Sequence, residues 1–283
     1  MNPDRNQAAR ELLAFYLEAG VDAVLGETAI DRFADTAETS RRPASGRPAG
    51  EAPGASEPQP GNRPALDRSR PTAPAAAPIP LPPDSAVMAA REQAKNATTL
   101  DELRSILDGF TGCTLRATAT RLVFADGNPQ ARVMFVGEAP GRDEDIAGLP
   151  FVGRSGQLLD RMMAAIGLTR ANAYIANIVP WRPPGNRTPT PQESAICLPF
   201  TLRQIELVDP DVLVCLGGPS AQTLLGSRDG ILKTRGRWFA FQTGSREIRA
   251  TATLHPAYLL RQPLQKRLAW RDFLAIKKAL TAS

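Results

Sequence analysis

The chain has 283 residues, 42% of them hydrophobic and 22% charged, so it is long enough to bury a core without disulfide or metal staples. Lys and Arg number 34 against 29 Asp and Glu, and the resulting net charge of +5 permits a polyanionic partner without demonstrating one. No stretch is apolar enough for a membrane span and the first residues form no signal peptide, so we expect a cytoplasmic protein without a membrane partner.

The first 84 residues are expected to form two segments outside the main domain. Residues 1–33 contain an amphipathic helix, because apolar residues recur at helical spacing over residues 6–19. Residues 34–84 are expected to be a disordered linker rich in Pro, Ala and Arg, since 12 of the 26 prolines fall between residues 36 and 83. The helix either binds an unidentified protein or docks on the main domain.

From residue 85 onward, short β-branched stretches alternate with helical patterns. Strands are predicted over residues 132–137, 173–179, 211–217 and 247–254. Helices are predicted over residues 85–110, 155–166, 219–225 and 263–280, and from Thr190, where Thr190 and Glu193 make a capping box. This alternation indicates an α/β fold, a three-layer α/β/α sandwich with a mostly parallel sheet.

Three polar segments follow predicted strands. A glycine-rich loop, residues 137–156, follows the first strand, Asn177 ends the second, and His255, the only histidine, follows the last. Ligands bind at the carboxyl ends of strands in open parallel sheets, so these segments are expected to meet at one edge. A lone histidine is more often a satisfied core residue, but this convergence favours a site.

The glycine-rich loop is ambiguous when it is considered alone. Residues 137–141 lack the spacing of a dinucleotide fingerprint and the lysine of a phosphate-binding loop. Asp143, Glu144 and Asp145 form either a hydrated acidic tip or a divalent-metal site, and the latter would indicate a metal-dependent phosphoester hydrolase. Phe151 would ordinarily belong to the core.

Three longer motifs carry a family resemblance. They are GEAPGRDEDIAGLPFVGRSGQLLDRM, which begins at Gly137, YIANIVPWRPPGNRTPTPQE, which begins at Tyr174, and HPAYLLRQP, which begins at His255. Together they resemble the family-4 uracil-DNA glycosylases, and the similarity covers roughly residues 110–279. It implies a four-stranded, mostly parallel sheet and a catalytic domain over residues 85–283.

The activity implied by the resemblance is DNA repair. Such an enzyme flips uracil out of single- or double-stranded DNA and hydrolyses its N-glycosidic bond, leaving an abasic site for base excision repair. We expect it to act as a monomer. The alternative is a module that binds uracil or abasic sites with little or no turnover.

The resemblance also implies roles for the residues at the edge of the sheet. Phe151 is expected to stack on the flipped base, and Asn177 to read its O4 and N3–H edge. His255 is expected to donate from Nε2 to the uracil O2 as negative charge develops there, joined by backbone N–H groups of Glu138 and Ala139.

The group that holds the attacking water is left open. Ala139 occupies the position at which the best-studied branch of the superfamily has an aspartate that handles this water. Glu138 and Glu144 are therefore candidates for that role; the alternative is that the bond breaks with large oxocarbenium character and captures water late, and stabilisation of the leaving group is ranked above general-base catalysis. Glu144 is also expected near C5, where it would crowd out the methyl group of thymine.

DNA contacts are expected around the same edge. The family inserts the segment after the histidine into the minor groove, so Leu259 and Leu260 are candidates for an apolar wedge. The candidates for polar contacts to DNA are Arg154, Ser155, Arg182, Asn186, Arg187 and Arg261.

Family-4 enzymes generally bind a [4Fe–4S] cluster through four cysteines. Cys113 and Cys197 match two of these ligands, whereas Phe110 and Trp181 stand at the other two positions. Cys215 lies within a predicted strand and is interpreted as a small core residue. Because four thiolates are the usual requirement, we expect no iron–sulfur cluster, no other metal and no cofactor.

Overall fold

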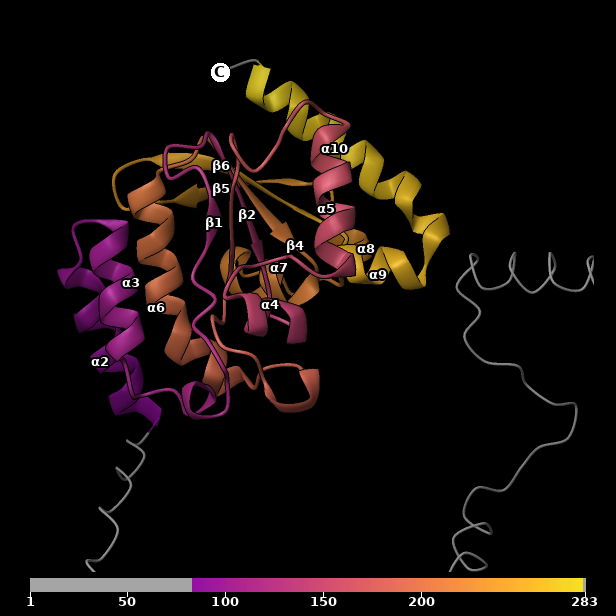
Figure 1. Ribbon diagram of the computed structural model, residues 1–283. Helices are drawn as coiled ribbons and strands as arrows, with labels where there is room; N and C mark the ends of the chain where they lie inside the picture. Colours follow the sequence, from indigo (N-terminus) through magenta and orange to yellow (C-terminus); the bar gives the residue numbers. More distant parts are fainter. Residues whose placement is uncertain (1–82, 282–283) are drawn as a thin grey trace, which may run out of the picture. The chain divides into compact units, whose positions relative to one another are not determined.

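The computed structural model describes residues 83–281 (Figure 1). The expected N-terminal helix, residues 1–33, and nearly all of the expected linker lie outside the described residues. The first described helix begins at Pro83, two residues before the expected start of the domain. Within residues 83–281, no helix has both the length and the apolar character that a bilayer span requires.

The sheet within these residues has six strands in the order β1-β3-β2-β4-β6-β5. The strands are β1 (Asp126–Gly127), β2 (Val133–Gly137), β3 (Tyr174–Asn177), β4 (Val212–Leu216), β5 (Trp238–Gln242) and β6 (Glu247–Thr253). The central four, β3, β2, β4 and β6, are parallel, and β1 and β5 pair antiparallel at the two edges.

The expectation of four strands is thus wrong in number, although the α/β sandwich and the parallel centre are confirmed. The two missed strands are both at edges. β1 has only two residues, too few for a recognisable pattern. β5 has only one buried residue, Phe241, and pairs antiparallel with β6, so it lacks the continuous apolar run of a buried parallel strand.

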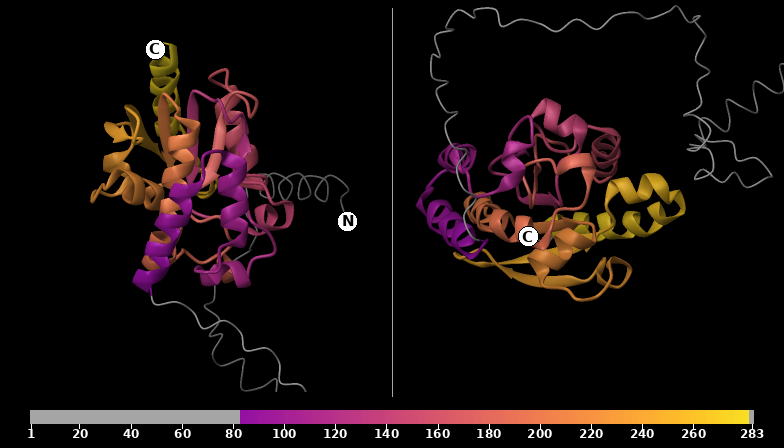
Figure 2. Two further views of the ribbon diagram at one scale, coloured as in Figure 1. Left: turned by 90° about the vertical axis from the view of Figure 1, so that its left-hand side faces the viewer. Right: turned by 90° about the horizontal axis from the view of Figure 1, so that it is seen from below.

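Helices cover both faces of the sheet (Figures 1 and 2). The α-helices are α2 (Pro83–Asn96), α3 (Leu100–Gly109), α4 (Arg142–Ala147), α5 (Arg154–Ala164), α6 (Pro191–Val208), α7 (Gly218–Leu225), α8 (Ile231–Thr234), α9 (Pro256–Arg261) and α10 (Lys266–Thr281). Short 3-10 turns span Thr114–Ala117, Pro184–Asn186 and Pro263–Gln265. Helices α2, α3 and α6 cover one face, and α5 and α10 cover the other.

The alternation of side chains along β2 divides the core into two layers. Met134 and Val136 pack toward α2, α3 and α6, whereas Val133 and Phe135 pack toward α5 and α10. All five residues of β2 are buried, which is the pattern of a parallel strand covered on both sides. The polar carboxyl ends of the strands are therefore free to form a site, because the core is complete without them.

Two predicted helices differ from their expected bounds because of local hydrogen bonds and a proline. The helix expected over residues 85–110 divides into α2 and α3, because Thr99 forms the N-cap of α3. The Thr99 hydroxyl accepts from the Glu102 N–H at 3.2 Å, and the Glu102 carboxylate accepts from the Thr99 N–H at 3.2 Å. The predicted capping box at Thr190 is confirmed. The last helix begins at Lys266, after a 3-10 turn that Pro263 opens.

Candidate active site

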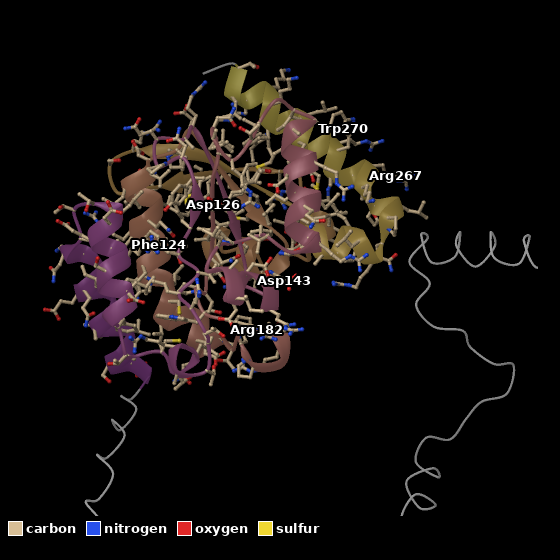
Figure 3. All side chains as sticks on the ribbon, viewed as in Figure 1. Phe124, Asp126, Asp143, Arg182, Arg267 and Trp270 are labelled. Atoms are coloured by element: carbon tan, nitrogen blue, oxygen red, sulfur yellow. The ribbon has the colours of Figure 1, made fainter. Side chains whose placement is uncertain are left out.

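A cavity of about 590 Å³ opens at the carboxyl ends of the parallel strands. Its lining includes Glu138, Ala139, Glu144, Phe151, Ser155, Asn177, Asn186, Arg187, Gly217, Gly218, His255, Tyr258 and Arg261. Asp143 on α4 and Arg182 lie at the same end of the sheet (Figure 3). The three polar segments that follow β2, β3 and β6 therefore meet in one cavity.

Phe151 and Asn177 lie side by side over Gly137, the last residue of β2. A Cβ atom on Gly137 would lie 2.4 Å from Oδ1 of Asn177 and 2.6 Å from Cζ of Phe151, closer than any Cβ contact allows. Glycine is thus required at this position for the amide and the ring to reach the cavity floor. Asn177 is 4% exposed, and among the described residues its Oδ1 has no hydrogen-bond partner.

The backbone of Phe151 is strained. Its φ angle is +54°, in the left-handed region that residues with large side chains rarely adopt. The first turn of α5 packs directly against this backbone at Gly156. A Cβ atom at that position would lie only 1.7 Å from the Phe151 carbonyl oxygen. Such strain costs about 1–3 kcal/mol and is concentrated at functional sites in proteins.

His255 forms the N-cap of α9 and faces Phe151. Its Nδ1 accepts a hydrogen bond from the Ala257 N–H at 3.1 Å, so Nε2 carries the proton of the neutral ring. The imidazole lies 5.6 Å from the Phe151 ring between centroids, at an interplanar angle of 33°. Burial, with a smaller contribution from the charge of Arg261, lowers the pKa of His255 to about 4. The imidazole is therefore neutral at physiological pH.

Glu138 begins the loop after β2 and lines the cavity. Burial raises the pKa of its carboxyl group. Its Oε1 is buried and accepts no hydrogen bond within the part of the chain that the structure describes. Glu138 and Asn177 thus each present an unsatisfied oxygen at the cavity, where a ligand or water can satisfy it.

Glu144 is held by the backbone rather than free in the cavity. Its Oε1 accepts from the N–H groups of Val152 at 3.1 Å and Gly153 at 3.0 Å, and its Oε2 accepts from Gly141 at 3.1 Å. Both carboxylate oxygens are therefore occupied, although the side chain lines the cavity. This arrangement fixes the loop that carries Phe151.

The acidic residues of α4 do not share a ligand. Asp145 accepts hydrogen bonds from the Thr120 N–H at 2.8 Å, the Thr120 hydroxyl at 2.9 Å and the Arg121 N–H at 3.2 Å. Asp143 is exposed, and the described residues contain no group of three or more His, Cys, Asp or Glu side chains arranged for a metal ion. The geometry thus gives the metal-dependent hydrolase interpretation no support.

Four of the six polar candidates for DNA contact belong to the lining of the cavity. Ser155, Asn186, Arg187 and Arg261 line it. Arg154 is exposed at the start of α5. Two of the candidates are held by partners on the protein: Arg187 makes a two-point ion pair with Glu193 at 2.7 and 2.8 Å, and Arg182 donates to Asn186 at 2.6 Å.

The expected wedge role of Leu259 is wrong. This side chain is 0% exposed and packs with Leu158, Leu254 and Ala269, because α9 turns it inward. Leu260 is partly buried against the same cluster and keeps some exposed surface. Of the segment after His255, Arg261 is the exposed residue that lines the cavity.

The residues at the expected cluster position do not fit a [4Fe–4S] group. The sulfur atoms of Cys113 and Cys197 lie 3.8 Å apart in a hydrogen bond, and both residues are buried. Phe110 and Trp181 are also buried, and the Phe110 ring packs edge-on against Phe200 with centroids 5.0 Å apart. Two thiols and two aromatic rings cannot supply four thiolates. The absence of a cluster stays a prediction.

The environments of Cys197 and of Cys215, the one thiol outside the pair, do not favour a four-thiolate site. Contact with Cys113 and burial raise the pKa of Cys197, which favours its protonated form. Burial raises the pKa of Cys215 to about 12, and this residue is fully buried within β4. Cys215 is thus a core residue, as its position in the strand predicts.

The carboxyl end of β4 also contributes to the cavity, although no polar motif in the sequence marks it. β4 ends at Leu216, and Leu216, Gly217 and Gly218 line the cavity. Gly217 has a φ angle of +92°, and a Cβ atom there would lie 3.0 Å from Cβ of His255. The rule that located the other three segments, applied to the end of β4, would have found these residues.

The fold and the cavity define an open α/β domain with a ligand-sized cavity at the carboxyl edge of its parallel strands. The family model described as "Uracil DNA glycosylase superfamily" matches residues 124–274. Three similar proteins are type-4 uracil-DNA glycosylases. The one from Archaeoglobus fulgidus is 39% identical over 182 residues, 63% of this chain and 92% of its own length.

The type-4 uracil-DNA glycosylase from Thermotoga maritima is 45% identical over 152 residues, 53% of this chain and 78% of its own. That from Saccharolobus solfataricus is 38% identical over 175 residues, 60% of this chain and 81% of its own. The chain therefore belongs to the uracil-DNA glycosylase superfamily and, within it, to the type-4 family.

Proposed function

We propose that this protein is a DNA-repair glycosylase that hydrolyses the N-glycosidic bond of uracil in DNA and leaves an abasic site. The observation that carries the proposal is the single cavity in which Phe151, Asn177 and His255 meet. An aromatic face, an amide and a neutral donor are the groups that a flat, uncharged base with carbonyl and N–H edges requires. Uracil reaches this cavity by flipping out of the helix, because its glycosidic bond is otherwise inside the base stack.

Asn177 reads the base in this proposal. Its amide oxygen, which lacks a partner, accepts from uracil N3–H, and its NH₂ group donates to O4. Cytosine presents the reverse pattern at these positions, so it leaves both groups of the amide unpaired. A two-point contact of this kind contributes about 1–3 kcal/mol of discrimination.

His255 stabilises the departing base. As the glycosidic bond breaks, the electron pair moves onto uracil and negative charge develops at O2. The proton on Nε2 is already placed because Nδ1 is fixed by the Ala257 N–H, so the donor needs no reorganisation. A donor of this kind contributes about 2.7–4 kcal/mol to the stabilisation of a transition state.

Glu138 is the group that we assign to the attacking water. It has a buried oxygen without a partner and a raised pKa, whereas both oxygens of Glu144 are bound to backbone N–H groups. A carboxyl group whose pKa moves toward the working pH is a more effective general base. Glu138 orients water toward the sugar carbon and accepts its proton, and Glu144 maintains the loop.

The proposed partner is uracil-containing DNA, and the protein binds it as a monomer. Arg261 and Ser155, which line the cavity, and Arg154, which is exposed at the start of α5, are the proposed contacts to phosphates, and Leu260 is the remaining candidate for an apolar contact with the bases. The pair between Arg187 and Glu193 orders the 3-10 turn beside the cavity rather than leaving a free cation.

The direct test is base release from oligonucleotides that carry one uracil, in single and double strands, with EDTA present. Release of uracil and an intact sugar-phosphate backbone before alkali treatment are expected. Matched oligonucleotides with thymine, hypoxanthine or xanthine define the range of bases. Tight binding to the uracil strand without release would replace the proposal by a recognition module, and strand cleavage that EDTA abolishes would replace it by a metal-dependent nuclease.

A further inference from the structure

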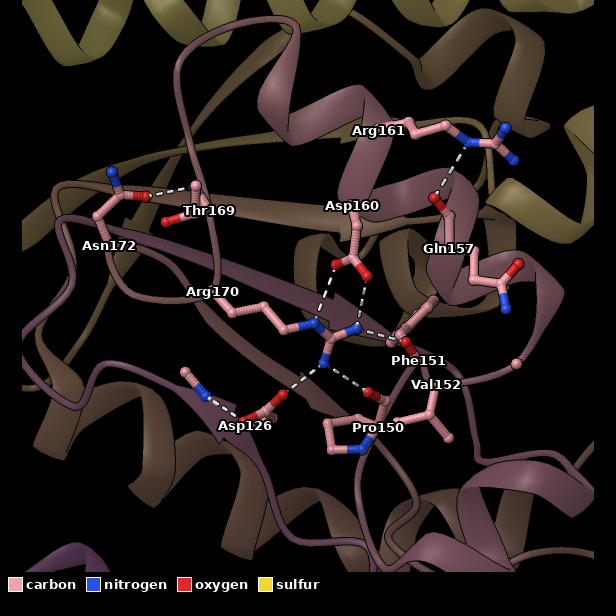
Figure 4. Close-up of polar contacts among 12 residues, drawn as sticks. Asp126, Pro150, Phe151, Val152, Gln157, Asp160, Arg161, Thr169, Arg170 and Asn172 are labelled. Carbon is pink, nitrogen blue, oxygen red and sulfur yellow. Dashed lines mark hydrogen bonds and ion pairs between the residues drawn. The ribbon is translucent and has the colours of Figure 1, made fainter.

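Arg170 lies outside the cavity but holds the residue that forms its aromatic wall. It stands in the loop between α5 and β3, and its side chain is 25% exposed. Figure 4 shows its guanidinium at the centre of a network that joins this loop to α5, β1 and the segment around Phe151. A loop arginine of this kind would ordinarily be a solvated charge.

The guanidinium group binds two successive carbonyl oxygens of the strained segment. Nη1 donates to the Pro150 carbonyl at 3.1 Å, and Nη2 donates to the Phe151 carbonyl. Phe151 is the residue whose φ angle is +54°. Because a left-handed residue relaxes unless its neighbours hold it, these two bonds fix the direction in which the ring leaves the backbone.

Two carboxylates anchor the guanidinium to regular structure. Asp126 of β1 accepts from Nη1 at 2.5 Å, and Asp160 of α5 accepts from Nε at 2.9 Å (Figure 4). Arginine presents its donors in a planar fork, so one side chain can bind both carboxylates and both carbonyls at fixed angles. The position of the Phe151 backbone is thereby tied to a strand and a helix.

The opposite side of the same segment is held by Glu144. Its Oε1 accepts from the N–H groups of Val152 and Gly153, the two residues that follow Phe151. Four consecutive backbone groups, two carbonyls and two N–H groups, are thus bound by two charged side chains. Arg170 is the member of this pair that touches no part of the cavity lining except the Phe151 backbone.

We propose that Arg170 is a positioning residue that sets the Phe151 ring for stacking on the flipped base. The inference rests on the proposed function, since it assigns the ring a base to stack on. It predicts an effect on turnover that passes through Phe151 alone. The ring would be displaced, not lost, when the guanidinium is removed.

The test uses Arg170→Met, which keeps the length of the side chain and removes its donors. Turnover of a uracil oligonucleotide is expected to fall about 10- to 100-fold, the effect of a small misplacement of a group in contact with substrate. The affinity for uracil-free DNA is expected to stay unchanged. Arg170→Lys, which keeps the charge but not the fork, should recover part of the turnover.

Arg161→Met is the matched control. Arg161 also lies in this region, where its Nε donates to the Gln157 carbonyl at 3.3 Å (Figure 4). The Arg161→Met variant should turn over the uracil oligonucleotide at the wild-type rate. An equal loss in both variants would show a general effect of charge and overturn the proposal, as would full turnover in Arg170→Met.

A double-variant cycle separates positioning from stability. In a Phe151→Leu background, Arg170→Met should lower turnover by less than about twofold, because non-additivity marks two residues that act as one unit. A full additional loss in that background would overturn the proposal. If Arg170→Met does not fold, the same cycle with Arg170→Lys decides it.

Failure of the proposed function can be distinguished from failure of the proposed role of Arg170. A wild-type protein that releases no uracil would refute the activity, and turnover of the variants would then carry no information. The role of Arg170 would be decided by a crystal structure of Arg170→Met: a changed φ angle at Phe151 supports it, and a φ angle that stays near its wild-type value overturns it.

Discussion

The imidazole of His255 accepts the Ala257 N–H at Nδ1, so the tautomer of the only histidine in the chain is set by the first turn of α9. The same bond opposes protonation, because a protonated Nδ1 would face another donor. The neutral ring is thus the form that the fold maintains, and the Nε2 proton is the one available in the cavity.

The first prediction concerns this titration. The C2–H signal of His255 in tag-free protein should titrate near pH 4, and in urea near the ordinary value of about 6.5. Between these pH values the unfolded chain binds the proton and the folded chain does not. The contribution of His255 to stability is therefore fully present above about pH 6.5 and is lost as the pH falls toward 4. A midpoint at pH 6 or above in the folded protein would refute the assignment.

The second prediction separates the two nitrogens of His255. His255→Ala should reduce turnover by about 10²–10³-fold and leave DNA affinity nearly intact, because the donor acts on charge that exists only in the transition state. It should also lower the melting temperature, since the cap bond to Ala257 is lost. His255→Asn restores a cap acceptor without the Nε2 donor, so it should recover stability but not turnover. Wild-type turnover in either variant would remove His255 from the mechanism.

The third prediction tests base selection by Asn177. Asn177→Asp replaces the NH₂ donor by an acceptor, so the ratio of uracil to cytosine excision should fall by about 10- to 100-fold. The measurement is excision from paired oligonucleotides that differ only at this base. Asn128→Asp is the control, because Asn128 caps a distant loop through the Gln130 N–H. An unchanged ratio in Asn177→Asp would show that another group reads the base.

The fourth prediction concerns iron. Purified protein should contain no stoichiometric iron or sulfide, because the resemblance places the buried Phe110 and Trp181 where the family has two ligand cysteines, and the Cys197 thiol donates a hydrogen bond to Cys113. The variant Cys113→Ala/Cys197→Ala should still excise uracil, with a loss of stability of about 1–2 kcal/mol from the two truncated core side chains. Cys215→Ala in β4 is the comparison for a buried thiol outside this pair. A full complement of iron that disappears with the two cysteines would contradict the prediction.

The parallel part of the fold could be predicted because its signals are local. The β-branched runs that form β2, β3, β4 and β6 are short and continuous, and polar residues stand where three of them end: Glu138 after β2, Asn177 at the end of β3 and His255 after β6. From that pattern alone, Asn177 and His255 were expected at one edge, and the structure places both in one cavity. The inward direction of Leu259 was not predicted, since a six-residue helix does not reveal which of its faces is buried.

Arg170 shows why the remainder could not be predicted. Its carboxylate partners, Asp126 and Asp160, are separated from it by 44 and 10 residues, and no repeat or motif links the three positions. The left-handed backbone of Phe151 is also invisible in the sequence, because aromatic residues carry no signal for it. Both features depend on how three separate elements pack.

The order of strands in the sheet has a consequence for synthesis of the chain. β6 is the last strand in the sequence but lies beside β4, and only its pairing there brings His255 to Gly217. A nascent polypeptide that has emerged only as far as β4 already carries Phe151 and Asn177 yet has no imidazole opposite them. We therefore expect products that end before β6 to lack the His255 donor and to excise uracil far more slowly than the full-length chain.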